Sequence, residues 1–378
     1  MKIHVWVPEY ASATGGIQTF SRFVVLALRD IYPTADIAVF SKNDTSFPEE
    51  GKDGSTTFVP LGWWGPKART VAFAAEIFRQ GVLHRPDLIV TTHVNFSPVA
   101  HSLRRLFRIP YLAVGHGIDV WEIKSRPLRA ALRTADCLVA VSEFTRSRMS
   151  TVLGLPPERI RIIPDTFDPE AFEPSPKPRF LLKRFGLRMD QPVILTIARL
   201  ASAERYKGYD QVLSAIPAIR RQFPDVRYIL GGRGPDRGRV ESLIAELDVA
   251  ENVILAGYVA EHELCEFYNL CDVFAMPSKG EGFGIVFLEA MACGKPVIAG
   301  NKDGSVDAVL SGRIGALIDP DDVKEIEATL LQLLQGTHPN PTLRDPGEVR
   351  RRVIEAYGYE RFVEILRGVL EEMVEQKC

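Results

Sequence analysis

A glycine-rich turn with two carboxylates, Gly280–Ala290 (GEGFGIVFLEA), is the strongest candidate for chemistry in this sequence. The apolar residues from Ile285 onward predict a short helix that ends near Gly294. A helix that starts behind a strand and a glycine turn presents free N–H groups and a partial positive charge, which suits a phosphate. Carboxylates repel phosphate, so Glu281 and Glu289 are better partners for the hydroxyls of a sugar or a ribose. A plain structural turn is the weaker alternative, because three glycines and two spaced carboxylates coincide here.

Two basic residues, Arg199 and Lys207, lie between a predicted strand at 193–198 and a predicted helix at 209–223. Ligands of parallel α/β sheets bind at the carboxyl ends of the strands. Fixed cations at that edge would stabilise a diphosphate, above all a departing one. Taken alone, the pair could equally be solvated surface residues. Beside the glycine-rich turn, it indicates a diphosphate site that needs no metal ion.

Two further glycine-flanked motifs each follow a predicted strand. Gly15-Gly16, within the segment 12–17 (SATGGI), offers bare backbone N–H groups in front of a helix, although it lacks the third glycine of a dinucleotide fingerprint. A plain tight turn is the alternative for this segment. His116 lies between two glycines that keep space open around its ring, but a lone histidine is as often structural. His93, also after a strand, is a weaker candidate.

Composition and the missing motifs exclude several functional classes. The net charge of −2 over 378 residues argues against nucleic acid as a partner. The sequence contains neither a zinc-binding H-E-x-x-H nor a P-loop, and we expect no metal and no cofactor. Five cysteines without a C-x-x-C pair favour free thiols in a reducing cytosol. The stretch Leu88–Leu103, the longest without a charge, is too short and polar for a membrane span, and no signal peptide is read at Met1. A cytoplasmic protein is therefore expected.

Short apolar runs alternate with helical patterns along the chain, which predicts an α/β fold with parallel sheets covered on both faces. The candidate strands are residues 3–7, 87–92, 111–114, 137–141, 161–163, 193–198, 227–230, 252–256, 273–276 and 296–299. These elements are too many for one compact domain. Five prolines within Pro164–Pro178 predict a linker, so we expect domains at 1–168 and 169–358. The amphipathic segment 359–378 could pack on either domain.

On these residues the chain resembles the retaining glycosyltransferases of family GT4, over nearly its whole length. Four motifs of that family are matched. Glu281 and Glu289 match its E-x7-E signature, and Arg199 and Lys207 match its Arg…Lys pair. His116-Gly117 matches its His-Gly, and Gly15-Gly16 matches its Gly-Gly loop. The stretch between Arg199 and Lys207 is longer than in many members. Asp165 is a departure, because many relatives carry Asn there.

The resemblance implies the GT-B architecture, with two Rossmann-like domains facing a cleft and a last helix that crosses back to the first domain. The acceptor would bind to the domain 1–168 and the nucleotide sugar to 169–358. By the same resemblance, Arg199 and Lys207 would bind the diphosphate, and the backbone of Gly15, Gly16, Ile285 and Val286 would contact phosphate. Glu289 would bind the ribose, and Glu281, with the backbone of Phe283 and Gly284, would bind the sugar, with His116 beside it. The base would lie near Arg233 and Val259.

The activity implied is transfer of a hexose from a UDP- or GDP-sugar to an acceptor hydroxyl, with retention and without a metal, in glycan or glycolipid biosynthesis. Front-side attack, in which the leaving phosphate accepts the proton, is the mechanism that family membership implies. One alternative is a sugar-nucleotide 2-epimerase of GT-B-like fold, for which Glu122 or Asp119 would have to serve as acid or base. Another is a catalytically silent subunit that binds sugar nucleotides.

A basic segment, residues 98–135, carries seven Lys and Arg residues against two acidic ones. The basic residues are Arg104, Arg105, Arg108, Lys124, Arg126, Arg129 and Arg133. They are either solvated helix faces or a docking surface for anionic lipid or a phosphorylated acceptor, which would place the protein peripherally at the inner face of a membrane. Trp63 and Trp64 could be interfacial aromatics there, or equally buried core or pocket residues.

Overall fold

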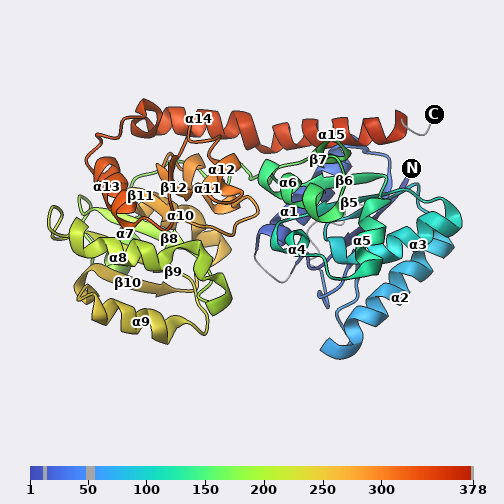
Figure 1. The fold of residues 1–378 in the computed structure, drawn as a ribbon, viewed down its shortest axis with the longest axis horizontal. Coiled ribbons are helices and arrows are strands. Elements are labelled where there is room, and N and C mark those ends of the chain that lie inside the picture. Colours follow the sequence, from blue (N-terminus) through green and yellow to red (C-terminus); the bar gives the residue numbers. More distant parts are fainter. Residues whose placement is uncertain (12–14, 48–55, 376–378) are drawn as a thin grey trace. The chain divides into compact units, whose positions relative to one another are not determined.

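The computed structural model describes residues 1–11, 15–47 and 56–375, and the chain forms two compact units, drawn as ribbons in Figure 1. The first unit runs from Met1 to Thr166 and also contains the C-terminal helix that begins at Tyr359. The second runs from Phe167 to Gly358. The chain therefore leaves the first unit inside the proline-rich segment, close to the boundary expected after residue 168.

The first unit is built on a parallel sheet with the strand order β3-β2-β1-β4-β5-β6-β7. Its strands are β1 (Lys2–Val7), β2 (Asp36–Ser41), β3 (Thr56–Pro60), β4 (Leu88–Thr91), β5 (Tyr111–Gly115), β6 (Cys137–Ala140) and β7 (Ile160–Ile162). Ile3 pairs in register with Ile37 on one side and Leu88 on the other, so β1 is central. Helices cover both faces, which explains why β4 and β6 are buried along their whole length.

The helices of the first unit are α1 (Gly16–Ile31), α2 (Pro66–His84), η1 (Val94–Phe96), α3 (Ser97–Phe107), α4 (Ile118–Trp121), α5 (Arg126–Arg133), α6 (Glu143–Leu153), η2 (Pro157–Arg159) and α15 (Tyr359–Glu375). The last of these, α15, packs on α1, where the ring centroids of Phe20 and Phe362 are 5.6 Å apart and edge-on. Tyr359 also donates a hydrogen bond of 2.5 Å to Asp30. The expected return of the last helix to the N-terminal unit is thus confirmed; residues 376–378 of that predicted helix lie outside the described residues.

The second unit has a parallel sheet with the order β10-β9-β8-β11-β12-β13. Its strands are β8 (Val193–Ile197), β9 (Arg227–Gly231), β10 (Val253–Gly257), β11 (Val273–Met276), β12 (Val297–Gly300) and β13 (Ala316–Ile318). Its helices are α7 (Arg179–Phe185), η3 (Ser202–Lys207), α8 (Tyr209–Ile219), α9 (Arg237–Glu246), η4 (Ala250–Asn252), η5 (Glu261–Glu263), α10 (Leu264–Leu270), α11 (Ile285–Ala292), α12 (Ser305–Ala308), α13 (Val323–Leu334), η6 (Pro341–Arg344) and α14 (Pro346–Tyr357). Two parallel, helix-covered sheets confirm the predicted pair of Rossmann-like domains.

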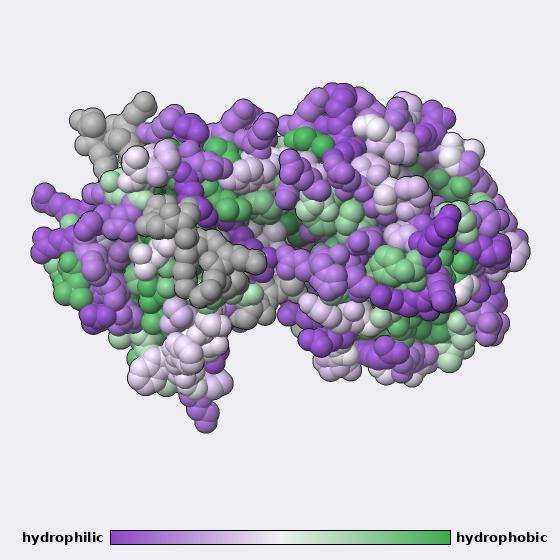
Figure 2. Space-filling view, turned by 180° about the vertical axis from the view of Figure 1, so that it is seen from behind, coloured by the Kyte–Doolittle hydropathy of each residue, from purple (hydrophilic) through white to green (hydrophobic). Residues whose placement is uncertain are grey.

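Each unit has its own apolar core between sheet and helices. Trp6, Phe73 and Tyr111 are fully buried in the first unit, and Phe274 and Phe287 pack edge-on in the second. Hydrophilic residues cover most of the face shown in Figure 2, and the hydrophobic ones there occur in small separate groups. Among the described residues, every helix is either too short or too polar to cross a bilayer.

Candidate active site

The loops that follow β8, β9 and β11 carry the candidate residues of the second unit. Arg199 follows β8, Arg233 follows β9, and Glu281 follows β11. The three strands are neighbours and parallel, so their carboxyl ends, and these loops, meet at one edge of the sheet.

An ion pair between Lys207 and Glu281 joins the loop after β8 to the loop after β11. The two side chains are only 17% and 15% exposed. Burial is the largest single effect and would by itself lower the pKa of Lys207, but the charge and the hydrogen bond of Glu281, joined by Tyr206 and Glu204, together outweigh it and raise that pKa above its usual value. The structure therefore holds a positive charge beside a carboxylate, and both are largely buried.

Tyr206 contacts both of these loops, a role that the sequence analysis did not predict. Its carbonyl oxygen accepts a hydrogen bond of 2.9 Å from the backbone N–H of Lys279. Its ring packs on Gly280 so closely that a Cβ there would lie 2.7 Å from ring carbons. The Nζ of Lys207 is 5.6 Å from the centroid of the ring. The first glycine of the motif is thus needed for packing between the loops.

Arg199 lies on the outer side of this arrangement. Its guanidinium is 2.6 Å from Glu204 and 73% exposed, so it does not share the buried pair of Lys207 and Glu281. Its charge still lowers the pKa of Tyr206, whose overall rise to about 12 is caused mainly by burial and then by Glu281. The structure therefore keeps Arg199 near Tyr206 but paired with Glu204, a partner that the sequence did not predict.

The turn in front of α11 is shaped by glycine and anchored by a buried carboxylate. Gly284 adopts a φ of 101°, in the left-handed region, and Ile285 and Val286 begin the helix directly after it. Asp303 is 1% exposed and accepts hydrogen bonds of 2.7 Å from the backbone N–H of Glu281 and from the hydroxyl of Ser278. Its other oxygen bonds to Ser305. Asp303 therefore fixes the backbone of Glu281, a role visible only in the fold.

Glu289 lies in the second turn of α11 and is buried. The hydroxyl of Tyr268, on the adjacent helix α10, donates a hydrogen bond of 2.6 Å to its Oε2. Burial raises the pKa of Glu289 to about 7, against the lowering effect of the Tyr268 hydrogen bond. Phe283, the other candidate of this turn, is buried with its ring 5.2 Å from that of Tyr357, so only its backbone could serve a ligand.

At the carboxyl ends of β9 and β10, Arg233 stacks on Tyr258 with the guanidinium carbon 4.8 Å from the ring centroid. The Tyr258 side chain is half exposed, and Val259 is buried beside Gly231. A cation stacked on an open aromatic ring is a suitable platform for a planar base. The structure thus places Arg233 against Tyr258, the neighbour of Val259 in the chain.

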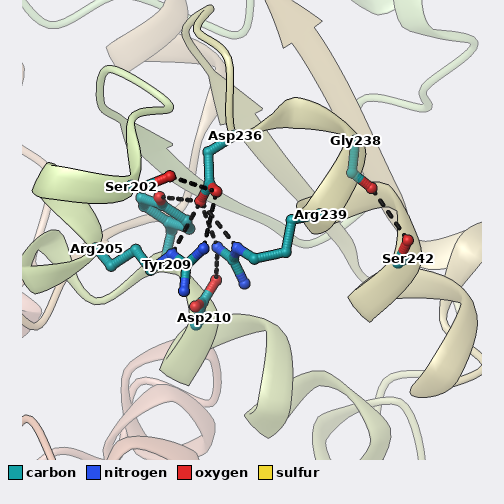
Figure 3. Close-up of polar contacts among 8 residues, drawn as sticks. All are labelled: Ser202, Arg205, Tyr209, Asp210, Asp236, Gly238, Arg239 and Ser242. Atoms are coloured by element: carbon teal, nitrogen blue, oxygen red, sulfur yellow. Dashed lines mark hydrogen bonds and ion pairs between the residues drawn. The ribbon is translucent and has the colours of Figure 1, made fainter.

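A second carboxylate that the sequence did not single out, Asp236, organises the loop that carries Lys207 (Figure 3). It is 4% exposed and accepts hydrogen bonds from Ser202, Arg205, Tyr209 and Arg239. The guanidinium of Arg239, followed by that of Arg205, holds the pKa of Asp236 well below its usual value. The cluster joins η3, α8 and the start of α9, and so fixes the backbone on both sides of Lys207.

In the first unit, His116 follows β5 at the carboxyl edge of its sheet. Its Nε2 is 2.8 Å from the carbonyl oxygen of Thr92. A carbonyl can only accept, so Nε2 carries the proton and Nδ1 is left as an acceptor. Burial lowers the pKa of His116 to about 4, against the raising effect of the Thr92 bond, so the ring is neutral at neutral pH. The ring of Phe20 packs edge-on against it at 5.0 Å.

Two ionisable side chains accompany His116. Asp119 accepts a hydrogen bond of 3.0 Å from the backbone N–H of His116, and burial raises its pKa. Burial likewise lowers the pKa of His93, against the charge of Asp119. His93, the weaker sequence candidate, therefore lies in the electrostatic range of the residues around His116.

The Gly15-Gly16 turn precedes α1, and residues 12–14 of its motif lie outside the described residues. Gly15 has extended backbone, and its carbonyl accepts from the N–H of Thr19. The buried carboxylate of Asp44 accepts a hydrogen bond of 2.6 Å from the backbone N–H of Tyr10, in the segment between β1 and this turn. The turn is thus at the carboxyl end of β1, where the sequence placed it.

The tryptophan pair and most of the basic segment lie on the surface. Trp63 and Trp64 are 72% and 56% exposed, so the buried alternative for them is wrong. Five basic side chains of the segment 98–135 are exposed without an ion pair that would occupy them: Arg105, Arg108, Arg126, Arg129 and Arg133, among the described residues. Arg104 is instead bound to Asp136.

Throughout the described part of the chain, His, Cys, Asp and Glu nowhere form a group of three suited to a metal ion.

Two sequence families match the chain: residues 179–356 match the family described as "Glycosyl transferases group 1", and residues 14–171 match "Glycosyltransferase Family 4". A GDP-mannose-dependent alpha-(1-6)-phosphatidylinositol monomannoside mannosyltransferase of Mycolicibacterium smegmatis is 35% identical over 235 residues, which are 59% of this chain and 60% of that relative. A D-inositol 3-phosphate glycosyltransferase of Acidothermus cellulolyticus is 30% identical over 81% of this chain and 72% of its own length. Among solved structures, a sucrose-phosphate synthase from Thermosynechococcus elongatus has a TM-score of 0.82 at 22% identity, covering 99% of both chains. The match to the first relative thus leaves more than a third of its length uncovered.

Proposed function

The chain belongs to glycosyltransferase family 4, and from that membership we propose that it transfers a hexose from a nucleoside diphosphate sugar to an acceptor hydroxyl, with retention and with no metal ion. The observation that carries the proposal is the buried pair of Lys207 and Glu281 at the turn before α11, with Glu289 one turn further along. We propose that residues 169–358 bind the donor and that residues 1–168, with the C-terminal segment 359–378, bind the acceptor.

In this proposal, the positive groups of the second unit stabilise the leaving diphosphate. Cleavage of the glycosyl–phosphate bond leaves negative charge on the phosphate oxygens. Lys207 is already charged and desolvated, and the N–H groups of Ile285 and Val286 begin a helix. To reach the diphosphate, the exposed Arg199 would have to leave Glu204, whose side chain is only 14% exposed.

The two glutamates bind hydroxyl groups. Glu281 takes the hydroxyls of the transferred sugar, with the backbone of Phe283 and Gly284, and Glu289 takes those of the ribose. A carboxylate accepts two or more such bonds, so Glu289 can keep its bond to Tyr268 and still bind a ribose. The acceptor hydroxyl attacks on the face that the diphosphate leaves, and its proton passes to the leaving phosphate oxygen.

His116 acts in the acceptor part as a neutral hydrogen-bond acceptor. Its Nδ1 is the free acceptor of the ring, so it can receive a sugar hydroxyl. The same neutral state makes it unsuited to donate a proton at neutral pH. We propose that His116 positions the sugar, and that the backbone of Gly15 and Gly16 approaches the phosphate.

We propose GDP-mannose as the donor and a UDP-sugar as the second choice. The relative from Mycolicibacterium is described as GDP-mannose-dependent, and the stacked pair of Arg233 and Tyr258 offers a face and N–H donors to a purine. A thermal-shift screen of GDP, UDP and ADP with their sugar conjugates tests this choice. GDP and GDP-mannose should raise the midpoint most, because a ligand that binds only the native state stabilises it according to its affinity. Equal midpoints with all of them would contradict the proposal.

The epimerase alternative has no support among the relatives reported above. Its two required residues are also poorly placed for acid–base chemistry: Glu122 is exposed beside Lys124, and Asp119 is buried against backbone N–H groups. Incubation with GDP-mannose alone, followed by incubation with an acceptor, separates the activities. Transfer that needs the acceptor and yields the α-linked product is expected; a 2-epimer and free nucleotide without acceptor would favour the epimerase.

We propose a lipid-linked acceptor and a peripheral contact of the first unit with anionic membrane. The name of the relative from Mycolicibacterium includes a phosphatidylinositol monomannoside, and the first unit exposes Trp63 and Trp64 as well as arginines of α3 and α5. Sedimentation with vesicles of anionic and of neutral lipid tests the contact. Binding to the anionic vesicles should fall as salt is added and should weaken in a Trp63→Ser, Trp64→Ser variant. Equal binding to neutral vesicles would contradict it.

A further inference from the structure

Two cysteines that are far apart in sequence face each other in the second unit. Cys265 lies on α10 and Cys293 directly follows α11, and their sulfur atoms are 3.9 Å apart. Both are free thiols. A disulfide needs a sulfur–sulfur distance of about 2.0 Å, so an approach of roughly 2 Å between two packed helices would close one.

The surroundings of Cys265 make it the more reactive of the two. It is partly exposed, whereas Cys293 is buried. Its sulfur is 3.4 Å from the amide nitrogen of Asn269, an N–H donor that favours a thiolate. The hydrogen bond from Cys293, against the opposing effect of burial, lowers the pKa of Cys265 to about 6. A thiolate that is accessible and has a resolving thiol beside it is the arrangement of an oxidisable pair.

We propose that Cys265 and Cys293 are the site of a reversible disulfide, formed when a hydroperoxide oxidises Cys265. The Cys265 thiolate attacks one peroxide oxygen, the O–O bond breaks, and Cys265 becomes a sulfenic acid while the other oxygen leaves as water or alcohol after protonation. The sulfur of Cys293 then attacks that of Cys265 and displaces hydroxide, which takes the proton of the Cys293 thiol. Two thiols and one hydrogen peroxide thus give one disulfide and two waters, and a dithiol reverses the step.

The other described cysteines are poorly suited to this chemistry. Cys271 is fully buried, and burial raises its pKa to about 12. Cys137 lies in the first unit, is also buried, and has its pKa raised to about 12 for the same reason. Cys378 lies outside the described residues, so the experiment must identify the bonded partners and not only count thiols.

The pair lies one helical turn from the carboxylate of the proposed donor site. Cys265 precedes Tyr268 by three residues on α10, and Cys293 follows Glu289 by four, with its backbone N–H bonded to the Glu289 carbonyl at 3.1 Å. Closing the disulfide would therefore move both ends of the Tyr268–Glu289 hydrogen bond. This coupling rests on the proposed function; formation of the disulfide does not.

The test uses the full chain, reduced, desalted, exposed to hydrogen peroxide, blocked with N-ethylmaleimide and digested without reductant. Peptides containing Cys265 and Cys293 should be found cross-linked, the intact mass measured before blocking should fall by two hydrogens, and dithiothreitol should restore both free thiols. Cys265→Ser should abolish the cross-link, whereas the matched control Cys137→Ser should keep it. Peptide mapping of the wild type identifies the bonded cysteines directly. The buried Cys293 therefore need not be replaced, and a folding defect of a Cys293→Ser variant would not affect this identification. Cys265 left reduced, oxidised only to sulfinic acid, or bonded to another cysteine would overturn the proposal.

A second measurement reads the coupling with GDP as the probe. Oxidised wild type should bind GDP about tenfold more weakly than reduced wild type, as expected when a hydrogen bond to a charged group is disturbed. The oxidised Cys265→Ser protein should keep the affinity of the reduced form. An unchanged affinity in a chain whose disulfide is verified by mass would overturn the coupling, while absence of GDP binding in the reduced chain would instead contradict the proposed donor.

Discussion

The hydroxyl of Tyr268 is 2.6 Å from Oε2 of Glu289, and this hydrogen bond joins α10 to α11 inside the second unit. Burial, opposed in part by this bond, raises the pKa of Glu289 to about 7. The residue that we propose to bind ribose therefore changes charge close to neutral pH, and both stability and ligand binding should respond.

The stability of the second unit should fall as the pH rises through about 7. The folded-state pKa of Glu289 lies above its unfolded value of 4.5, so between the two the folded chain binds more protons than the unfolded one. The stabilising contribution is complete below the unfolded pKa and lost above the folded pKa. Urea unfolding between about pH 5 and about pH 8 should show this decline in wild type and in the exposed control Glu251→Gln. Glu289→Gln should flatten it; an identical slope would contradict the raised pKa.

Affinity for the donor nucleotide should change in the opposite direction. Ribose hydroxyls donate to a carboxylate better than to a neutral carboxyl, so binding of GDP should tighten as Glu289 loses its proton near pH 7. Isothermal titration of wild type and Glu289→Gln over the same pH range checks this. Parallel pH profiles for the two proteins would argue against a ribose contact at Glu289.

Loss of the buried lysine should be far more costly than loss of an exposed one. Lys207→Met keeps the apolar stem, removes the charge beside the diphosphate and leaves Glu281 unpaired. Removal of one group that stabilises developing charge typically costs about 10²–10³ in rate, and we expect a loss of that size in kcat/KM. Lys302→Met is the matched control, because Lys302 is half exposed and pairs with Asp319 in the same unit. Similar losses in both variants would remove Lys207 from the site.

The sequence predicted the residues that act through local spacing, and missed those that act through tertiary contacts. The glycine turn, Glu281 and the start of α11 are read from neighbouring letters, and α11 does begin at Ile285. Asp236 could not be found in this way, because its partners come from three separate segments. The contact between Cys265 and Cys293 likewise depends on how α10 packs against α11.

The fold prediction missed three strands, β2, β3 and β13. Two of them, β3 and β13, lie at sheet edges, whereas β2 is an inner strand of six residues. The exposure of Trp63 and Trp64 was also undecided. Aromatic residues alone do not show which face of a domain they occupy, and only the packed structure places them outside.

The Asp236 cluster should be needed for stability and, through the loop it holds, for activity. Asp236→Asn removes the charge shared by Arg205 and Arg239, and since only Asp236 is buried while the arginines are 47% and 30% exposed, we expect a loss of about 1–3 kcal/mol in the free energy of unfolding. Because the pKa of Asp236 is lowered, its contribution to stability should be complete at pH values above the usual pKa of an aspartate. That contribution should be lost as the pH falls and Asp236 becomes protonated. Chemical denaturation checks the first point, with the exposed Asp248→Asn, paired to Arg220, as the control expected to change little. Equal unfolding free energies would contradict the structural role.

An alanine at Gly16 tests whether the donor phosphate approaches the Gly15-Gly16 turn, because the substitution should affect activity without lowering stability. Among the described residues, no heavy atom beyond the adjoining residues and the helix's own backbone lies within 4 Å of a Cβ added at Gly16, and the same holds at Gly238 on α9. Alanine at either position should therefore leave the thermal midpoint unchanged or raise it slightly, since alanine favours helix over glycine. If a phosphate approaches the backbone at Gly16, the methyl group displaces it, and Gly16→Ala should lose roughly tenfold or more in kcat/KM while Gly238→Ala keeps wild-type activity. Wild-type activity in both variants, at unchanged midpoints, would show that the donor does not approach this turn.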